Sequence, residues 1–132
     1  MSEAEKLIKM AREARKMSYS PYSRFAVGAA LLCGSGKVYT GCNIENGAFS
    51  PTCCAERVAF FKAVSEGEME FSAIAIVGGE VGGEEKFCPP CGVCRQVMSE
   101  FVDSENFKIY LVRNGKIEDY TMSEILPLAF ER

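Results

Sequence analysis

Apolar residues follow two different periods along the chain, and the changes of period divide it into elements. Between Leu7 and Ala14 they recur every three or four positions, which is typical of an amphipathic helix. Ser2 followed by Glu5 forms a capping-box pattern that predicts the start of this helix, and we expect its end near Met17. By contrast, residues 25–33 are apolar on both faces, which predicts a strand buried on both sides.

The rest of the chain shows the same two patterns, separated by turn residues. They predict a strand at 37–43 after a hairpin turn at 34–36, a loop at 44–53, a helix at 54–66, a strand at 71–77, a glycine-rich loop at 78–86, a helix from about Pro90, strands at 107–112 and 116–119, and a short helix that starts at Thr121 and breaks at Pro127. This order predicts a single α/β domain over residues 1–132. We expect a mixed five-stranded sheet with helices on both faces, in three α/β/α layers.

The charge balance and the termini limit the partners and the compartment. The 132 residues carry a formal net charge of −3, so bulk electrostatic attraction to nucleic acid is not expected. The apolar run at residues 73–77 is far too short to span a bilayer. The first residues are polar and lack the apolar segment of a signal peptide. We therefore expect a cytoplasmic protein that binds neither nucleic acid nor membranes.

Seven cysteines and no histidine narrow the chemistry of any site. An odd number of cysteines without an export signal favours metal binding or catalysis over a set of disulfide bonds. Because histidine is absent, metal ligands must come from cysteine and carboxylate side chains. For the same reason, a general base must be another type of residue.

Two cysteine motifs stand where a loop enters a predicted helix. Cys91 and Cys94 follow two prolines, and proline is favoured at the first position of a helix. Residues three apart share a helix face, so both thiols can reach one point, and a helix N-terminus lowers the pKa of such thiols. Adjacent thiolates indicate a soft metal, most commonly zinc. The second motif is Cys54-Ala55-Glu56, and the two helix starts can meet at the carboxyl ends of neighbouring parallel strands.

Cys54-Ala55-Glu56, followed at a distance by Cys91-x-x-Cys94, resembles the zinc-dependent nucleoside and nucleobase deaminases. Three further motifs are similar to the small, single-domain cytidine deaminases: FAVGAA at 25–30, GCNIEN at 41–46 and CAER at 54–57. The resemblance covers most of the chain and implies a cytidine-deaminase-like fold. It implies a hydrolase that converts cytidine and deoxycytidine to uridine and deoxyuridine plus ammonia, in pyrimidine salvage.

The resemblance also implies which residues form the metal site. One zinc ion per chain would be bound by Cys54, Cys91 and Cys94, because the family's acidic residue follows its first ligand by two positions. Without the resemblance, Cys53 could take the place of Cys54, and Cys88 forms a second C-x-x-C pair with Cys91. The other cysteines are expected to be small apolar or loop residues: Cys33, Cys42, Cys53 and Cys88.

Glu56 and Arg57 would support the chemistry at this metal. Zinc with three protein ligands keeps a fourth position for water, which then loses a proton near pH ~7. In the implied reaction the resulting hydroxide attacks C4 of the base, while Glu56 shuttles protons to N3 and to the departing ammonia. Arg57 would donate hydrogen bonds to a ligating thiolate. Outside this context, Glu56 would be an ordinary acid of a first helical turn, and Arg57 a partner in a surface ion pair.

Five residues are assigned to the substrate by the same resemblance: Phe25, Asn43, Glu45, Ala55 and Phe130. Asn43 and Glu45 alternate at the end of a strand, so both can point to one side and hold the ribose hydroxyls; otherwise they are polar turn residues. Phe25 would pack against the pyrimidine, and otherwise belongs to the core. Phe130 would enter a neighbouring subunit's site in a homotetramer, and otherwise lies on its own core.

One position departs from the family pattern. Phe49 stands where these deaminases usually carry tyrosine, whose hydroxyl assists in holding the sugar. The departure concerns contacts near the 5′-hydroxyl of the substrate and leaves the chemistry at the base unaffected.

Other functions remain as alternatives at this point. One is deamination of a related small molecule such as blasticidin S, or of a base in a polynucleotide. A different class is a thiol oxidoreductase that uses Cys91 and Cys94, which leaves Cys54-Ala55-Glu56 without a role. A further class is a non-catalytic zinc module, although structural zinc usually takes four protein ligands.

Overall fold

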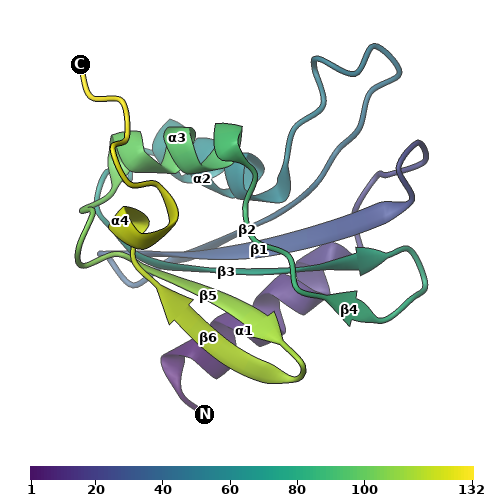
Figure 1. Cartoon of the computed structure of the whole chain (residues 1–132), viewed down its shortest axis with the longest axis horizontal. Helices are drawn as coiled ribbons and strands as arrows, with labels where there is room; N and C mark the ends of the chain where they lie inside the picture. Colours follow the sequence, from purple (N-terminus) through teal and green to yellow (C-terminus); the bar gives the residue numbers. More distant parts are fainter.

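The computed structural model describes residues 1–132 and shows one sheet with helices on both faces (Figure 1). In chain order the elements are α1 (Glu3–Arg15), β1 (Phe25–Cys33), β2 (Val38–Cys42), α2 (Ala55–Ser65), β3 (Phe71–Glu80), β4 (Glu85–Lys86), α3 (Gly92–Phe101), β5 (Lys108–Arg113), β6 (Lys116–Tyr120) and α4 (Met122–Ile125). Both predicted capping boxes are present, with Ser2 starting α1 and Thr121 starting α4. None of the helices is both long and apolar enough to cross a bilayer.

The sheet is mixed, as predicted. Its strands follow the order β2-β1-β3-β5-β6, and β4 pairs with β3 beside this path. The β3–β5 pair is parallel, and α3 lies in the connection between these two strands. The pairs β1–β2, β1–β3, β3–β4 and β5–β6 are antiparallel.

The predicted number of five strands is wrong, because the glycine-rich segment 78–86 contributes to the sheet. β3 continues to Glu80, which pairs with Phe25 of β1, and Gly79 pairs with Glu85 of the two-residue β4. A Cβ atom at Gly79 would lie 2.3 Å from the carbonyl oxygen of Glu84. The missing side chain therefore allows the chain to fold back closely here, although glycines weaken a strand when judged from sequence alone.

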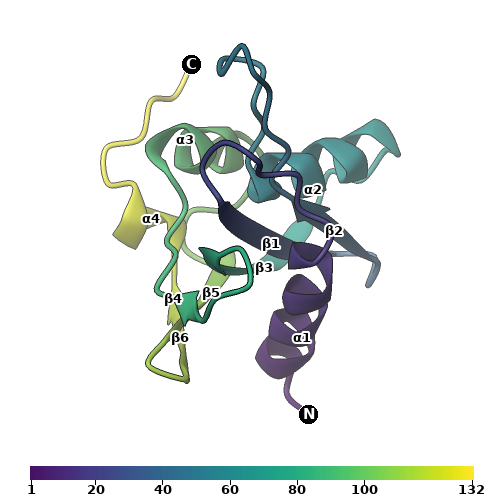
Figure 2. The same cartoon turned by 90° about the vertical axis from the view of Figure 1, so that its right-hand side faces the viewer.

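Two apolar layers cover the two faces of the sheet, which confirms the predicted α/β/α arrangement. Figure 2 shows α1 on one side of the sheet and α2 and α3 on the other. The α1 layer consists of Leu7, Ile8, Ala11, Ala30, Ala73, Ala75 and Val77. The opposite layer is larger and includes Leu31, Phe60, Ile74, Ile76, Met98, Phe107, Ile109, Leu111 and Met122. Alternating residues of β1 and β3 thus face opposite layers, as the period of a strand requires.

Gly41 sets the position of α2, the helix that follows the first cysteine motif. A Cβ atom there would lie 2.4 Å from the carbonyl oxygen of Ala55 and 2.7 Å from the backbone nitrogen of Ala59. The first turns of α2 therefore lie directly on the backbone of β2. This contact fixes Cys54 and Glu56 relative to the sheet.

Candidate active site

Both cysteine motifs lie at helix starts, as the sequence predicts. Cys54 is the N-cap residue of α2, and Cys91 is the N-cap residue of α3. The α3 helix starts at Gly92, two residues after the predicted start at Pro90. Cys94 lies in its first turn, where its backbone N–H donates to Cys91 Sγ over 3.5 Å. The two helices pack on the same face of the sheet, so their starts bring the three thiols together.

The three sulfur atoms have the spacing of a zinc site. Cys54 Sγ lies 3.9 Å from Cys91 Sγ, and Cys91 Sγ lies 3.4 Å from Cys94 Sγ. All three lie within 4.8 Å of one another. Tetrahedral zinc with bonds of about 2.3 Å holds its sulfur ligands about 3.8 Å apart. The donor set therefore fits zinc, and it contains neither Cys53 nor Cys88.

Hydrogen bonds favour the thiolate of Cys54. The Cys94 thiol lowers the pKa of Cys54 to about 5 by hydrogen bonding, and Arg57 adds to this effect. Arg57 Nη2 lies 3.5 Å from Cys54 Sγ and also donates to the Thr52 carbonyl oxygen over 3.4 Å. The pKa of Cys94 is raised because its proton is shared with Cys54 and because it is buried. Arg57 therefore contacts a candidate ligand, whereas a surface ion pair is not formed.

One donor beside this cluster has no partner. Arg57 Nε is buried and makes no hydrogen bond, although buried donors are nearly always paired. The guanidinium group also carries a positive charge next to the thiols, and this charge increases their tendency to ionise and to bind a cation.

Glu56 is buried in the first turn of α2, next to the three sulfurs. Its side chain is only 4% exposed, which is rare for a glutamate. Burial raises the pKa of Glu56 to about 7, and the nearby Cys54 contributes in the same direction. A carboxyl group with this pKa can both accept and release a proton near neutral pH. Residues two positions apart do not share a helix face. At the start of a helix, however, side chains lean toward the N-terminus, so Glu56 and Cys54 can still reach the same point.

Phe25 and Cys88 pack over Gly78, close to Glu56. A Cβ atom at Gly78 would lie 2.7 Å from Cys88 Sγ and 3.1 Å from Phe25 Cε2. Burial raises the pKa of Cys88 to about 12, and the negative charge of Glu56 contributes. Cys88 is therefore a neutral packed thiol close to Glu56. The sequence indicated a small apolar role for it but gave no sign of this location.

Asn43 holds the backbone at the start of β1, and Glu45 holds the backbone of the segment just before it. Asn43 Oδ1 accepts from the Val27 backbone N–H over 2.8 Å, and Asn43 Nδ2 donates to the Phe25 carbonyl oxygen over 2.8 Å. Glu45 accepts from the backbone N–H groups of Tyr22 and Ser23, over 2.9 and 3.1 Å.

The Ser23 hydroxyl also donates to Glu45. Of the several hydrogen bonds to Glu45, this one lowers its pKa most, and the two backbone N–H groups add to it. The carboxylate is therefore ionised and partly satisfied. Sequence reasoning did not find these partners, because they lie about 20 positions away along the chain.

The remaining substrate candidates differ in exposure. Ala55 is fully buried in the apolar layer beneath the site, so its side chain cannot reach a ligand and its backbone is the part that could. Phe130 is 69% exposed, so it does not lie on its own core. Its backbone is held by Gln96 of α3, which donates to the Phe130 carbonyl oxygen over 3.0 Å and accepts from its N–H over 3.4 Å. Phe49 is 72% exposed at the β2–α2 loop.

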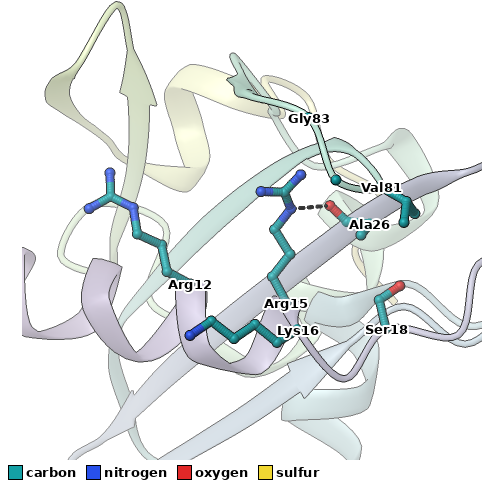
Figure 3. Close-up of a pocket in the computed structure, with 8 residues that line it drawn as sticks. Arg12, Arg15, Lys16, Ser18, Ala26, Val81 and Gly83 are labelled. Atoms are coloured by element: carbon teal, nitrogen blue, oxygen red, sulfur yellow. Dashed lines mark hydrogen bonds between the residues drawn. The ribbon is translucent and has the colours of Figure 1, made fainter.

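A separate hollow of about 500 Å³ lies beside the end of α1 and holds three cationic side chains (Figure 3). Each cation already has a partner. Arg12 pairs with Glu85 at 2.6 Å, and Lys16 pairs with Glu13 at 3.1 Å. Arg15 donates to two backbone carbonyl oxygens, those of Ala26 and Glu80. These bonds fasten α1 to β1 and β3, and the hollow contains none of the candidate catalytic groups.

Comparison with known proteins agrees with this geometry. The cytidine and deoxycytidylate deaminase zinc-binding region matches residues 1–110 of the chain. The cytidine deaminase of Sporosarcina psychrophila is 49% identical, over 98% of this chain and 93% of that protein. That of Halalkalibacterium halodurans is 50% identical, over 94% and 91%. The crystal structure of cytidine deaminase from Burkholderia pseudomallei superposes with a TM-score of 0.87 and 41% identity, covering 98% of this chain and 100% of that one.

These matches place the chain among the zinc-dependent deaminases. Within that class, it belongs to the cytidine and deoxycytidylate deaminase family. The three-cysteine cluster is the part of the structure suited to the family's zinc ion.

Proposed function

We propose that the chain is a cytidine deaminase that hydrolyses the 4-amino group of cytidine and deoxycytidine, giving uridine or deoxyuridine and ammonia. The observation that carries this proposal is a carboxyl group, Glu56, buried beside a three-sulfur cluster at the starts of two helices. Cys54, Cys91 and Cys94 would hold one zinc ion per chain. The reaction serves pyrimidine salvage.

Glu56 moves the protons of the reaction. Bound zinc supplies a Lewis acid that makes a water molecule nucleophilic near neutral pH. Glu56 would accept one proton of that water and deliver it to N3 of the base. It would then take the second proton, from the oxygen now bonded to C4, and pass it to the departing amino group. A pKa of about 7 suits a group that must both accept and donate. Arg57 holds Cys54 in place and favours its thiolate.

The sugar is held by complementary groups. The Asn43 amide offers a remaining N–H donor to a sugar hydroxyl, whereas the ionised Glu45 offers one remaining acceptor site, on Oε2. Phe25 supplies an apolar edge for the pyrimidine ring, and the backbone at Ala55 borders the site. Free cytosine lacks the hydroxyl groups that Asn43 and Glu45 would bind, so it should be a poor substrate.

The active unit is a homotetramer in which Phe130 completes a neighbour's site. Three exposed apolar side chains on irregular segments support this: Phe49, Leu128 and Phe130. The β2–α2 loop and the C-terminal tail both extend beyond the layer of α2 and α3, on the side of the sheet that carries the site (Figure 1). Exposed aromatic groups of this kind are typical of interfaces.

The other functional classes explain less of the site. A thiol oxidoreductase needs a pair of cysteines, but here Cys54 joins Cys91 and Cys94. A structural zinc module usually has four protein ligands and gives Glu56 no task. The net charge of −3 disfavours a polynucleotide substrate. Seven free thiols suit a reducing compartment, so we place the protein in the cytoplasm.

The test is a substrate panel with the purified, zinc-loaded protein. Cytidine, deoxycytidine, cytosine, blasticidin S and a cytosine-containing single-stranded oligonucleotide are followed by ultraviolet absorbance. We expect deamination of both nucleosides and much slower reaction of the other three compounds. No uridine from cytidine would overturn the proposed activity, and equal efficiency on cytosine would overturn the role of the sugar.

A further inference from the structure

We propose that Ser18 is a positioning residue for sugar recognition. Its hydroxyl group occupies the second lone pair of the Asn43 amide oxygen, so that Asn43 acts toward the substrate only as a hydrogen-bond donor. This inference rests on the proposed function and adds to it a residue outside the motifs that define the family resemblance.

The Ser18 hydroxyl is closest to the Asn43 side chain. Its oxygen lies 2.5 Å from Asn43 Oδ1, compared with 3.1 Å from Ser20 Oγ and 3.3 Å from the Asn43 carbonyl oxygen. A hydroxyl has one proton to donate, and the shortest of these contacts receives it. Ser18 thus donates to the Asn43 amide oxygen.

The other partners leave the amide one orientation. Val27 presents a backbone N–H, which only donates, and Phe25 presents a carbonyl oxygen, which only accepts. The amide oxygen must therefore face Val27, and the amide nitrogen must face Phe25. This assignment follows from the chemistry of backbone groups, so the side chain cannot be flipped without losing both bonds.

Ser18 takes up the remaining lone pair of the Asn43 amide oxygen. An amide oxygen has two lone pairs, and here one meets the Val27 N–H while the other meets the Ser18 hydroxyl. The amide nitrogen has two hydrogens, of which Phe25 takes one. One N–H is left for a ligand. A sugar hydroxyl that accepts from Asn43 must then donate elsewhere, and Glu45 offers the acceptor.

Removal of the Ser18 hydroxyl frees one lone pair of the Asn43 amide oxygen and leaves the neighbouring backbone hydrogen bonds in place. The Tyr19 N–H donates to the Asn43 carbonyl oxygen over 3.0 Å, and the Glu45 N–H donates to the Tyr19 carbonyl oxygen over 2.8 Å. Figure 3 shows Ser18 at the hollow beside the end of α1, and its side chain is partly exposed. A smaller side chain is therefore tolerated, and a lone pair of Asn43 becomes free for water.

The test compares Ser18→Ala with Ser18→Thr, which keeps a hydroxyl group, and with Ser72→Ala at an exposed serine of β3 as the matched control. Each variant is assayed on cytidine and on 2′,3′-dideoxycytidine, which lacks the 2′- and 3′-hydroxyl groups of the sugar. We expect Ser18→Ala to raise KM for cytidine roughly 3- to 10-fold, the effect of one hydrogen bond, with kcat within about 2-fold. For dideoxycytidine KM should stay within about 2-fold, and Ser18→Thr and Ser72→Ala should resemble the wild type on both substrates.

The outcomes distinguish a role of Ser18 in sugar recognition from a purely structural role and from failure of the proposed function. An equal rise in KM for both substrates would show that Ser18 acts only on the scaffold and would overturn the proposal, as would an unchanged KM for cytidine. If Ser18→Ala fails to fold, Ser18→Cys, a weaker donor of similar size, must show the same selective rise for cytidine. A wild-type protein that does not deaminate cytidine overturns the proposed function itself, a readout that needs no variant.

Discussion

The metal corner and the open rim of the site are built in different ways. The metal corner consists of Cys54, Cys91, Cys94 and Glu56, and each of these side chains comes from the start or first turn of a helix. The open rim consists of residues 44–53 and 126–132, which are largely irregular and expose large apolar side chains. One chain therefore brings the candidate catalytic groups together, whereas its rim leaves large apolar side chains exposed.

The two regions also differ in what holds their side chains in place. In the metal corner, helix geometry sets the spacing of Cys91 and Cys94, and the close contact of Gly41 with α2 sets Glu56. At the rim, long-range hydrogen bonds such as those of Gln96 fix only the backbone of Phe130. An aromatic side chain held in this way gains apolar burial only when another surface covers it.

The largest effect should come from removing a sulfur at the metal corner. Cys54→Ser should lose zinc and all measurable activity, because three sulfurs are the whole protein donor set. Metal analysis of the purified protein measures this loss. The matched control is Cys53→Ser, whose thiol lies one position away and outside the cluster. Full zinc in Cys54→Ser together with loss in Cys53→Ser would mean that the neighbouring cysteine is the ligand.

Next in size is the loss of the proton shuttle. Glu56→Gln keeps the shape of the side chain but cannot take a proton, so turnover should fall at least by the ~10²–10⁴-fold typical of general acid–base catalysis. Zinc content should match the wild type, since Glu56 does not belong to the sulfur cluster. Steady-state turnover and metal analysis on the same sample test both statements. Turnover close to wild type would remove Glu56 from the mechanism.

A smaller effect, confined to the rim, should follow from shortening the tail. Deletion of residues 128–132 removes Phe130, and loss of one buried phenylalanine from a neighbour's site should raise KM roughly 10- to 100-fold. Zinc content should not change, because the metal corner lies elsewhere. Phe130→Ala tests the side chain alone. Sedimentation that shows a fully active monomer at assay concentration would contradict both the tetramer and the shared site.

The two regions also differ in how far the sequence predicts them. Capping residues and three-residue spacing are local signals, so the helix starts and the Cys91–Cys94 pair follow from the pattern, whereas the choice of Cys54 over Cys53 depends on the family resemblance. The pairing of Gly79 with Glu85 and the bonds from Ser18 to Asn43 depend on residues brought together by the fold. No local pattern encodes them.

The smallest effect is expected at the tip of the β2–α2 loop, where Phe49 stands in place of the family's usual tyrosine. Phe49 is 72% exposed and packs edge-on against Tyr22, with ring centroids 6.3 Å apart. Phe49→Tyr adds a hydroxyl to an exposed ring, so the free energy of unfolding should change by less than about 0.5 kcal/mol. If the hydroxyl reaches the sugar in the assembled enzyme, KM for cytidine should fall roughly 2- to 5-fold, within the net contribution of one hydrogen bond.

The matched substrate for this variant is 5′-deoxycytidine, which lacks the hydroxyl group in question. Its KM should be the same for the wild type and Phe49→Tyr. An equal gain on both substrates would indicate better packing against Tyr22 instead of a sugar contact. Because the metal corner is complete in one chain, kcat should not move in either case, and a changed kcat would show that the rim and the metal corner are coupled.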